Sequence, residues 1–426
     1  MRLIRRPFRA LNRFLTFFLV RHRSLTALSV LVSVALVISF SNGFWLMARL
    51  ANVILVALPI AFVWSRLNVR GLEVDVERLD DRLQVGDLFE ERITIKNQNF
   101  FTKLWLEVED LSELPGHTPR RVISLGPRAK RSWRTASPCL RRGVYTVGPV
   151  RITSSDLFGL FRRSKTFGEP ETVLVYPRAV ELPRFWAPPA MLPGESRVRR
   201  PAYSVTPNAA SVRKYQPGDG FNRIHWRSTA RTGELMVKLF ELDPASDVWI
   251  ALDLHGGVQA GRGDDSTEEH GVRMATSIAR YFLLGNRSVG FVANGELEHT
   301  IEPERGIEQY ARILEALAIA KAQGDVPLSD LLNNEGRRFG RRTTVIVITP
   351  SIDETWVGSL QLLTTRGVKM AAVVMEPSTF GGQGTALLLF GALAAADIPT
   401  YLVKSSDDLA STLAAGAETA AAGGVR

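Results

Sequence analysis

Cysteine is nearly absent from this sequence, and its scarcity excludes two classes of protein. Cys139 is the one cysteine among 426 residues. No intramolecular disulfide can therefore form, and no zinc site can be built from several thiolates. The chain is not a small secreted scaffold held together by disulfides. Its 45% hydrophobic and 23% charged residues are ordinary for globular proteins.

Recognisable catalytic motifs are also missing. The sequence has no GxxxxGK[ST], HExxH or GxSxG pattern, and its six histidines are scattered, with none at metal-ligand spacing from another. No acid, base and nucleophile can be grouped from the sequence. We therefore expect a protein that is not an enzyme.

Acidic residues are missing from the first 70 positions. This segment holds ten arginines and accounts for the whole net charge of +10, because the rest of the chain carries 43 basic and 43 acidic residues. The basic excess adjoins an apolar segment, and this position indicates a lipid bilayer as the partner rather than nucleic acid.

Residues 24–65 contain a single charge, Arg49, and predict a transmembrane helical hairpin. One continuous helix of this length would measure about 60 Å, twice the hydrocarbon thickness of a bilayer. The turn signal Ser41-Asn42-Gly43 lies near the middle. We expect two spanning helices. The alternative is a single span, which would place everything after it outside the membrane.

The flanking charges predict the orientation of this hairpin. Seven arginines lie in the basic N-terminus, residues 1–23, and Arg66 and Arg70 follow the second span. Under the positive-inside rule both ends are cytoplasmic. We therefore expect a two-pass membrane protein with the bulk of its chain in the cytoplasm.

Short runs that alternate apolar and polar residues follow the membrane segment. This period of two, with Gly, Pro and Asn turns between the runs, predicts a small antiparallel β-sandwich over residues 71–167. We find no catalytic cluster in it and expect a spacer or interaction module. Eight prolines in residues 168–210 predict an extended connector. The sandwich strands are predicted at residues 72–76, 91–96, 104–108, 121–125 and 143–147.

Strands and helices alternate over residues 242–413. This order predicts a doubly wound parallel sheet that is buried on both faces, hence an α/β domain. The Ala/Gly tail, residues 414–426, should fray. Strands are predicted at 247–254, 288–293, 343–349, 368–375 and 400–403, and helices at 267–285, 306–322, 354–366, 384–396 and after Ser406.

Residues 211–241 form the densest polar tract. A turn at Pro217-Gly218-Asp219 precedes a predicted short helix, residues 222–231, which would place Arg223, Arg227 and Arg231 on one face. Nucleic acid is disfavoured because the tract lacks interleaved aromatic residues.

The function of this tract has two interpretations. It forms either an internal salt-bridge network with Asp219 or Glu234, anchored by Trp226, or a docking patch for an acidic partner or a phosphate. The candidate residues for either role are Arg213, Tyr215, Gly218, Asp219, Arg223, His225, Trp226, Arg227 and Arg231.

At this tract the sequence resembles the bacterial family catalogued as domain of unknown function 58. The resemblance implies a protein anchored in the bacterial cytoplasmic membrane with a von Willebrand factor A-like domain. Such proteins are often encoded beside a MoxR-type AAA+ ATPase and a transglutaminase-like membrane protein, and the resemblance implies no defined activity. It rests on Arg213, Tyr215, Gly218-Asp219, Arg223, Ile224 and Trp226, on Ala230-Arg231-Thr232-Gly233-Glu234-Leu235, and upstream on Arg142-Gly143, Tyr145, Gly148-Pro149, Asp156 and Phe158-Gly159-Leu160.

The resemblance also raises the question of a magnesium site. Von Willebrand factor A-like domains often bind Mg²⁺ through a D-x-S-x-S strand end and oxygens from later loops. Here Asp253-Leu254-His255-Gly256-Gly257 keeps the aspartate and loses both serines. Either Asp253, Thr349 and Asp353 form a degenerate metal site, or Asp253 caps a loop.

Two functions are consistent with these features. The first is a membrane-anchored scaffold or adaptor whose cytoplasmic domain engages a protein partner, with a MoxR-type ATPase as the expected one, in complex assembly or cell-envelope processes. The alternative is a hydrolase with Asp219, His225 and Asp253 in one cleft. The absence of a catalytic motif favours the scaffold.

Overall fold

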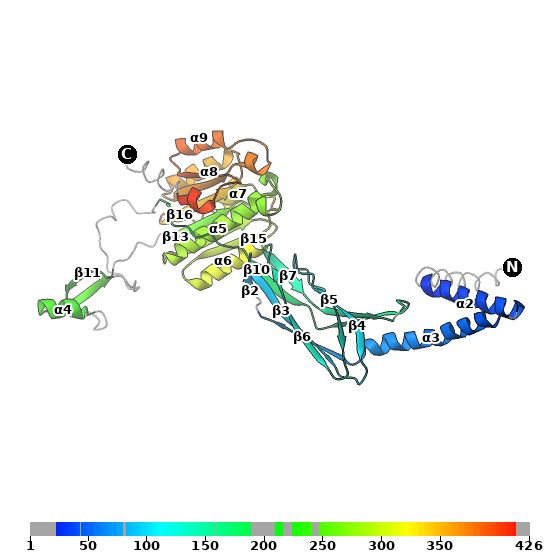
Figure 1. The fold of residues 1–426 in the computed structure, drawn as a ribbon. Coiled ribbons are helices and arrows are strands. Elements are labelled where there is room, and N and C mark those ends of the chain that lie inside the picture. The colour runs from blue at the N-terminus through cyan, green and yellow to red at the C-terminus, as the bar shows by residue number, and fades with distance from the viewer. Residues whose placement is uncertain are drawn as a thin grey trace, which may run out of the picture. The chain divides into compact units, whose positions relative to one another are not determined.

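The computed structural model describes residues 23–42, 44–79, 82–156, 158–188, 209–215, 224–240 and 247–414 (Figure 1). The chain divides into two compact units. One unit comprises Met1–Leu140 and Val144–Val175, and the other comprises Arg141–Gly143 and Tyr176–Arg426. The predictions for residues 1–22 and for the tail, residues 415–426, lie outside the described residues.

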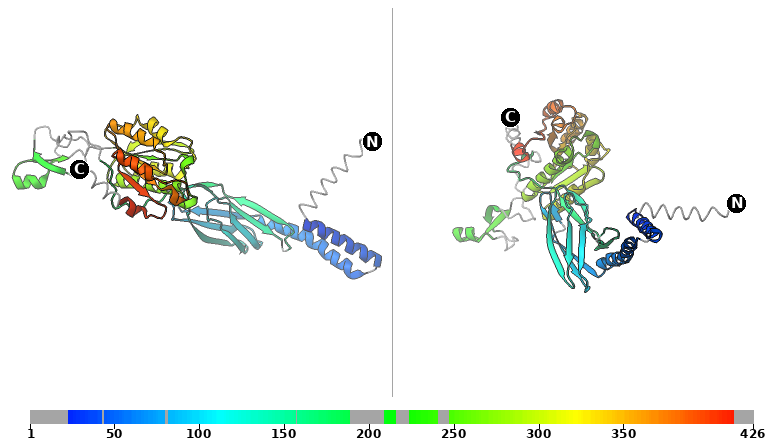
Figure 2. Two further views of the ribbon diagram at one scale, coloured as in Figure 1. Left: turned by 90° about the horizontal axis from the view of Figure 1, so that it is seen from above. Right: turned by 45° about the vertical axis from the view of Figure 1, so that its right-hand side comes forward.

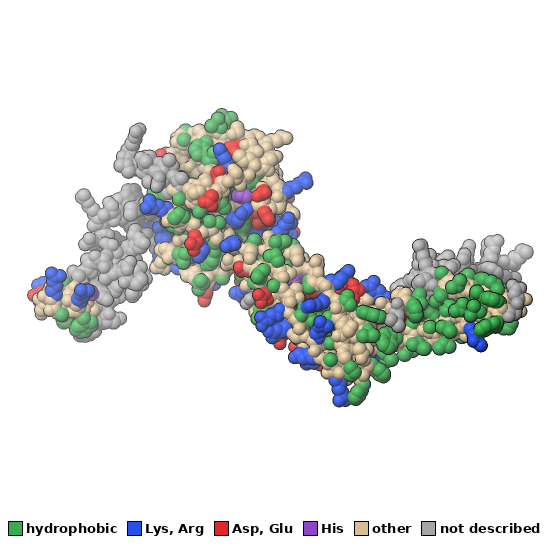
Figure 3. Space-filling view, viewed as in Figure 1, with side chains coloured by type: hydrophobic (Ala, Val, Ile, Leu, Met, Phe, Trp, Pro, Cys, Tyr) green, Lys and Arg blue, Asp and Glu red, His purple; other side chains and the backbone are tan. Residues whose placement is uncertain are grey.

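The first unit begins with two apolar helices, α2 (Arg23–Asn42) and α3 (Trp45–Val69), which lie side by side (Figure 2). By length and composition α3 could cross a membrane, and the apolar stretch of α2, Thr26–Ser41, is shorter. Hydrophobic side chains gather on the surface of both helices (Figure 3). Large exposed apolar surfaces are typical of contact with a membrane or another protein.

The rest of this unit consists of two antiparallel sheets, in the strand orders β1-β3-β6 and β5-β4-β8-β9, and a third sheet in the order β2-β10-β7. The first two sheets share one hydrophobic core, to which Ile93 and Ile95 contribute from one sheet and Leu106 and Val108 from the other. The strands are β1 (Leu72–Arg78), β2 (Arg82–Gln84), β3 (Leu88–Asn97), β4 (Lys103–Asp110), β5 (Arg120–Leu125), β6 (Lys130–Pro138), β7 (Gly143–Val147), β8 (Val150–Ser155), β9 (Arg162–Phe167) and β10 (Glu171–Tyr176).

All five strands predicted for this region are confirmed as β1, β3, β4, β5 and β7. The strands β2, β6, β8, β9 and β10 were not predicted, and β10 corrects the prediction that the extended connector begins at residue 168. Among them, β6 and β9 are the most polar. Most side chains of β9 are exposed, and those of β6 are exposed or half-buried except at Ser137. These strands therefore lack the apolar alternation by which a half-buried strand is recognised.

The second unit contains a six-stranded sheet in the order β15-β14-β13-β16-β17-β18. All neighbouring pairs are parallel except β14 with β15. The strands are β13 (Asp247–Leu252), β14 (Val289–Asn294), β15 (Glu298–Glu304), β16 (Thr343–Thr349), β17 (Lys369–Met375) and β18 (Thr400–Val403). The helices are α5 (Thr267–Leu284), α6 (Ile307–Ile319), α7 (Leu328–Glu335), α8 (Thr355–Thr365) and α9 (Leu387–Ala395), and single 3-10 turns cover Gly256–Val258, Gly263–Asp265 and Pro377–Phe380.

Both faces of this sheet are buried. Val248 and Ile250 of β13 belong to one core, with residues of α5 and α6, whereas Trp249 and Ala251 belong to another, with residues of α7, α8 and α9. The predicted α/β character and the five predicted strands are confirmed. Two elements were not predicted: α7 is short, and β15 is a charged edge strand that contains Pro303.

A small antiparallel pair, β11 (Ala209–Lys214) with β12 (Met236–Phe240), carries the polar tract. The helix α4 (Trp226–Thr232) lies between these strands in the sequence. Its start corrects the prediction of a helix over residues 222–231. Arg227 and Arg231 lie on this helix, whereas Arg223, the third arginine of the predicted face, lies outside the described residues.

Candidate functional site

The helix α4 is defined by its two ends. The ring of His225 accepts a hydrogen bond from the backbone N–H of Ser228 at 3.3 Å and so caps the N-terminus. Gly233, with φ of +73°, ends the helix in the left-handed conformation that glycine adopts without strain. Arg227 and Arg231, four residues apart, therefore share one face of a single short helix.

Three large side chains of α4 are exposed. Trp226 is 67% exposed, and Arg227 and Arg231 are exposed as well. Within the described residues Trp226 is thus not buried, and its predicted role as an apolar anchor stays a prediction. Its position at the start of α4 leaves it on the surface, whereas Ile224 and Val237 are buried among the side chains of this module that the structure describes.

The ion pairs near α4 also differ from the predicted internal network. Glu234 pairs with Lys214 rather than with an arginine. Within the parts of the chain that the structure describes, no carboxylate lies within ion-pair distance of Arg227 or Arg231. Backbone pairing places Arg213 opposite Val237, and the backbone N–H of Tyr215 bonds to the carbonyl of Leu235 at 2.8 Å. The other predicted members, Gly218, Asp219 and Arg223, lie outside the described residues.

The predicted magnesium residues come together only in part. Asp253 follows β13, Thr349 ends β16, and the Thr349 hydroxyl donates to Asp253 Oδ2 at 2.6 Å. Asp253 Oδ1 accepts from the backbone N–H of His255 at 3.0 Å. Asp353 is exposed, and both its oxygens accept hydrogen bonds from Thr355. Both oxygens of Asp253 are thus used within the protein, and burial raises the pKa of this carboxyl. These residues form a pair and a separate cap rather than a convergent ligand set.

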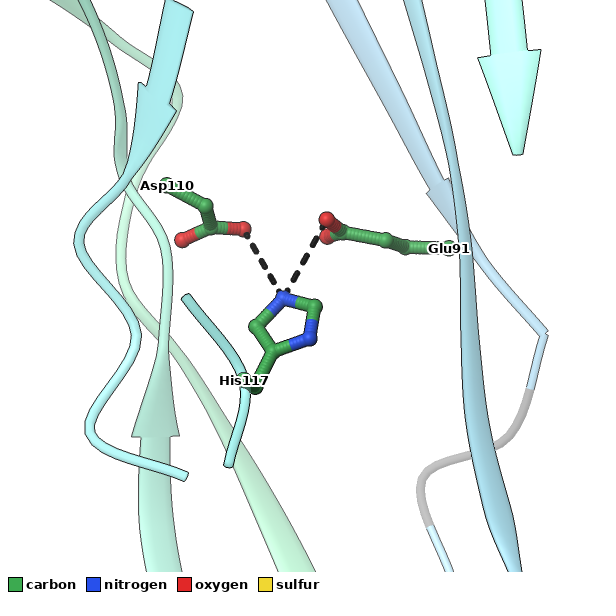
Figure 4. Close-up of side chains that lie close together, drawn as sticks. All are labelled: Glu91, Asp110 and His117. Carbon is green, nitrogen blue, oxygen red and sulfur yellow. Dashed lines mark ion pairs between the residues drawn. The ribbon is translucent and has the colours of Figure 1, made fainter. Parts of the chain in front are cut away.

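A cluster that the sequence did not predict lies inside the β-sandwich. It consists of Glu91 on β3, Asp110 at the end of β4, and His117 in the loop that follows (Figure 4). The three side chains are completely buried. His117 Nε2 lies 3.2 Å from Glu91 Oε1 and 3.8 Å from Asp110 Oδ2. Two acids and a histidine thus face one another in the core.

The outer atoms of this cluster are fixed by hydrogen bonds. His117 Nδ1 lies 3.0 Å from the Ser137 hydroxyl. Asp110 Oδ1 accepts from the Ser112 hydroxyl at 2.6 Å, from the Ser112 N–H at 3.0 Å and from the Gly148 N–H at 3.1 Å. These contacts hold the His117 ring and the Asp110 carboxylate in place and leave His117 Nε2 and Asp110 Oδ2 facing Glu91.

The charges in the cluster shift one another's pKa values. Burial raises the pKa of Glu91. Burial alone would also raise the pKa of Asp110, but the facing His117 and the Ser112 hydroxyl outweigh it and lower this pKa to about 2. Burial would lower the pKa of His117, but Asp110 and Glu91 outweigh it and raise this pKa to about 9. The cluster therefore favours a positive charge at its centre.

A signal for this cluster exists in the sequence. Glu91 lies in phase with Phe89 and Ile93 on β3, and Asp110 lies in phase with Leu106 and Val108 on β4, so both acids occupy core-facing positions. An acid in the apolar register of a strand needs a partner inside the core. Spacing alone could not identify His117, because the loop decides where its ring points.

Comparisons with known proteins find similarity in the part of the chain that contains the polar tract. A family model described as "Protein of unknown function DUF58" matches residues 211–380. The "Uncharacterized protein YeaD" of Bacillus subtilis (strain 168) is 25% identical over 301 residues, which cover 67% of this chain and 72% of that protein.

Two further similarities cover less of the chain. The "Uncharacterized protein Rv1480" of Mycobacterium tuberculosis (strain H37Rv) is 26% identical over 198 residues, 44% of this chain and 56% of that protein. Among solved structures, the CARDB domain of PF1109 from Pyrococcus furiosus has 19% identity and a TM-score of 0.19, and covers 25% of this chain and 94% of that domain. Similarity at this TM-score carries no argument about function.

Proposed function

We propose that this protein is a membrane-anchored, non-enzymatic scaffold of the domain of unknown function 58 family, whose α/β domain engages a protein partner. The observation that supports this most directly is the exposed surface of Trp226, Arg227 and Arg231 on α4, which we name the α4 surface. It lies within the residues that the family model matches. Tryptophan and arginine are the residue types most enriched at the energetic centres of protein interfaces.

The charge of the α4 surface favours an acidic partner. Two exposed guanidinium groups lie one helical turn apart without a described carboxylate to balance them. An acidic partner surface would supply that balance, and Trp226 would contribute apolar contact area. The resemblance to the family supplies the identity of the partner we propose, a MoxR-type AAA+ ATPase, with a transglutaminase-like membrane protein as a further member of the complex.

The strand order supports a von Willebrand factor A-like domain. The chain forms β13 first, adds β14 on one side, and then returns to add β16, β17 and β18 on the other. In open sheets of this kind ligands bind beyond the carboxyl ends of the strands, where the order reverses. Asp253 and Thr349 lie at this edge, but both are buried, so the partner proposal rests on α4 instead.

The apolar helices support the proposed anchor. We propose that α2 and α3 form a two-pass hairpin in the bacterial cytoplasmic membrane, with the sandwich and the α/β domain on the cytoplasmic side. Supporting features are the exposed apolar surface of both helices and the arginines at their outer ends.

The partner proposal predicts that the α4 surface controls binding. The purified, detergent-solubilised protein should bind the MoxR-type ATPase of its own organism. Combined Arg227→Ala and Arg231→Ala substitutions should weaken this binding at least about tenfold, because two charged contacts are lost. Titration by biolayer interferometry at several salt concentrations measures the effect.

A matched control separates this surface from net charge. Arg305→Ala combined with Arg337→Ala removes two other exposed arginines of the α/β unit and should leave the affinity unchanged. Equal affinity in a folded α4 variant and in the wild type would contradict the proposal, as would equal losses in both double variants.

The hydrolase remains the alternative prediction. His225 caps α4 and lies 2.7 Å from the Ser228 hydroxyl, and both oxygens of Asp253 are hydrogen-bonded elsewhere. Asp219 lies outside the described residues. Turnover of a phosphoester or peptide panel that is lost in His225→Ala would favour the hydrolase over the scaffold.

A further inference from the structure

Buried atoms without hydrogen-bond partners gather at one point of the sandwich. Among the described residues, both carboxylate oxygens of Glu91, Asp110 Oδ2 and His117 Nε2 lack such a partner. Leaving a buried polar or charged atom unsatisfied is unfavourable. A proton on His117 Nε2 would meet part of this set through the contacts with Glu91 and Asp110, and a cation between the three residues would interact with all four atoms.

The spacing of these atoms fits a small cation. One ligand atom from each residue lies within 4.8 Å of the others, and the two distances from His117 Nε2 are 3.2 and 3.8 Å. Neighbouring ligands of a tetrahedral ion with bonds of about 2.0–2.1 Å lie roughly 3.3 Å apart. Small movements of these side chains would bring all three residues into coordination.

We propose that Glu91, Asp110 and His117 bind one divalent transition-metal ion within the sandwich, and that Zn²⁺ fits these ligands. A histidine nitrogen with carboxylates is a typical zinc ligand set, whereas Mg²⁺ and Ca²⁺ prefer oxygen alone. The two carboxylates match the charge of the ion. Glu91 can supply two oxygens, so the three residues offer four donor atoms.

The surrounding hydrogen bonds have the arrangement that metal ligands require. With Nε2 directed at the ion, His117 Nδ1–H donates to the Ser137 hydroxyl. Ser112 and Gly148 hold Asp110 Oδ1 and leave Oδ2 for the ion. Such outer contacts fix the tautomer and orientation of the ligands.

One positive group lies near the cluster. Arg78 Nη2 is 4.0 Å from Asp110 Oδ2, but Arg78 Nη1 pairs with Glu171 at 2.9 Å. Glu171 therefore balances the Arg78 charge, and both cluster carboxylates are available to the ion. The proposal concerns the sandwich alone and is independent of any partner of α4.

The test is zinc binding by the full chain in detergent. Protein stripped with a chelator and titrated with ZnCl₂ alone should bind one Zn²⁺ per chain, and its thermal unfolding midpoint should rise as the site fills. Mg²⁺ at the same concentration should produce no comparable rise. No zinc binding by the folded wild type would overturn the proposal.

Variants locate the ion. Glu91→Gln and His117→Gln should each weaken zinc affinity by more than about 100-fold, and Ser137→Ala, which removes only an outer hydrogen bond, by about 10- to 100-fold. Ser137→Ala keeps the test valid if the ligand variants do not fold. The matched control is His299→Gln, at a half-buried histidine whose buried Nε2 lacks a described partner, and the zinc affinity of this variant should be unchanged.

A last variant separates the two candidate sites. Asp253→Asn should retain wild-type zinc affinity. Loss of zinc in Asp253→Asn with unchanged binding in Glu91→Gln and Ser137→Ala would move the ion to the strand-end residues and overturn the proposal.

Discussion

His270, on α5, shows how burial sets the charge of a single residue. Its side chain is nearly inaccessible, its Nδ1–H donates to the Ser266 carbonyl at 3.1 Å, and its ring meets Phe380 edge-on at 4.9 Å. Burial, helped by the nearby positive charge of Arg273, lowers the pKa of His270 below its ordinary 6.5. The neutral ring is therefore the form that the fold accommodates.

This residue predicts a pH dependence of stability. The unfolded chain takes up the His270 proton first as the pH falls, because its pKa is near 6.5. The stabilisation of the fold by neutral His270 is fully present above about pH 6.5 and is lost as the pH falls below that value. Thermal unfolding between pH 5 and 8 measures this effect. The unfolding midpoint of His270→Asn should fall less on acidification than that of the wild type, because asparagine does not titrate and can keep the hydrogen bond to Ser266. Parallel profiles for the two proteins would contradict this.

At the scale of elements, the end of α3 is fixed to the sandwich by two buried polar side chains. Asn68 donates to the Leu104 carbonyl at 2.6 Å and accepts from the Leu104 N–H at 3.1 Å. The ammonium of Lys103 donates to the carbonyls of Leu67 and Arg70. A cation at a helix C-terminus satisfies carbonyls that the helix itself leaves free. The helix α3 is thereby joined to the start of β4.

Lys103→Met should weaken this junction. Burial lowers the pKa of Lys103, but removing the ammonium leaves buried carbonyls without a donor, which costs about 1–3 kcal/mol of unfolding free energy. Chemical unfolding in detergent measures the change. Lys130→Met, at an exposed lysine, is the control and should change the free energy by less than about 0.5 kcal/mol. Equal effects of both substitutions would argue against a structural role for Lys103.

At the scale of the whole molecule, the proposed topology places both chain ends on one side of the membrane. Arginines flank the apolar helices on their outer ends, and the residues between the helices carry no charge. Every part of the scaffold proposal depends on this placement, because a MoxR-type ATPase is a cytoplasmic partner.

Reporter fusions test the topology. Green fluorescent protein fused after residue 426 should fluoresce, and a periplasmic alkaline phosphatase at the same point should be inactive, because the C-terminus is predicted to be cytoplasmic. The opposite pair of results would indicate a single span and remove the basis for the ATPase as partner. A fusion after Phe44 should reverse both signals and serves as the internal control.

Apolar periodicity determined most of the predicted elements. The runs that became β13, β16 and β17 are continuous and apolar because both faces of the sheet are buried, so they could be recognised without a partner strand. Edge and surface elements such as β15 and β9 carry mainly polar residues, and tertiary contacts rather than local pattern make them strands.

The candidate sites likewise include features that the sequence determined and features that only the tertiary structure decided. The sequence alone determined the apolar helices, the α/β domain and the arginine tract, because charge and hydrophobicity are properties of consecutive residues. Only the tertiary structure decided that Trp226 is exposed, that Glu234 pairs with Lys214, and that Glu91, Asp110 and His117 meet in the core. Side chains from separate strands and loops converge only when the sheets pack. The distance between such side chains therefore cannot be predicted from the local sequence around each of them.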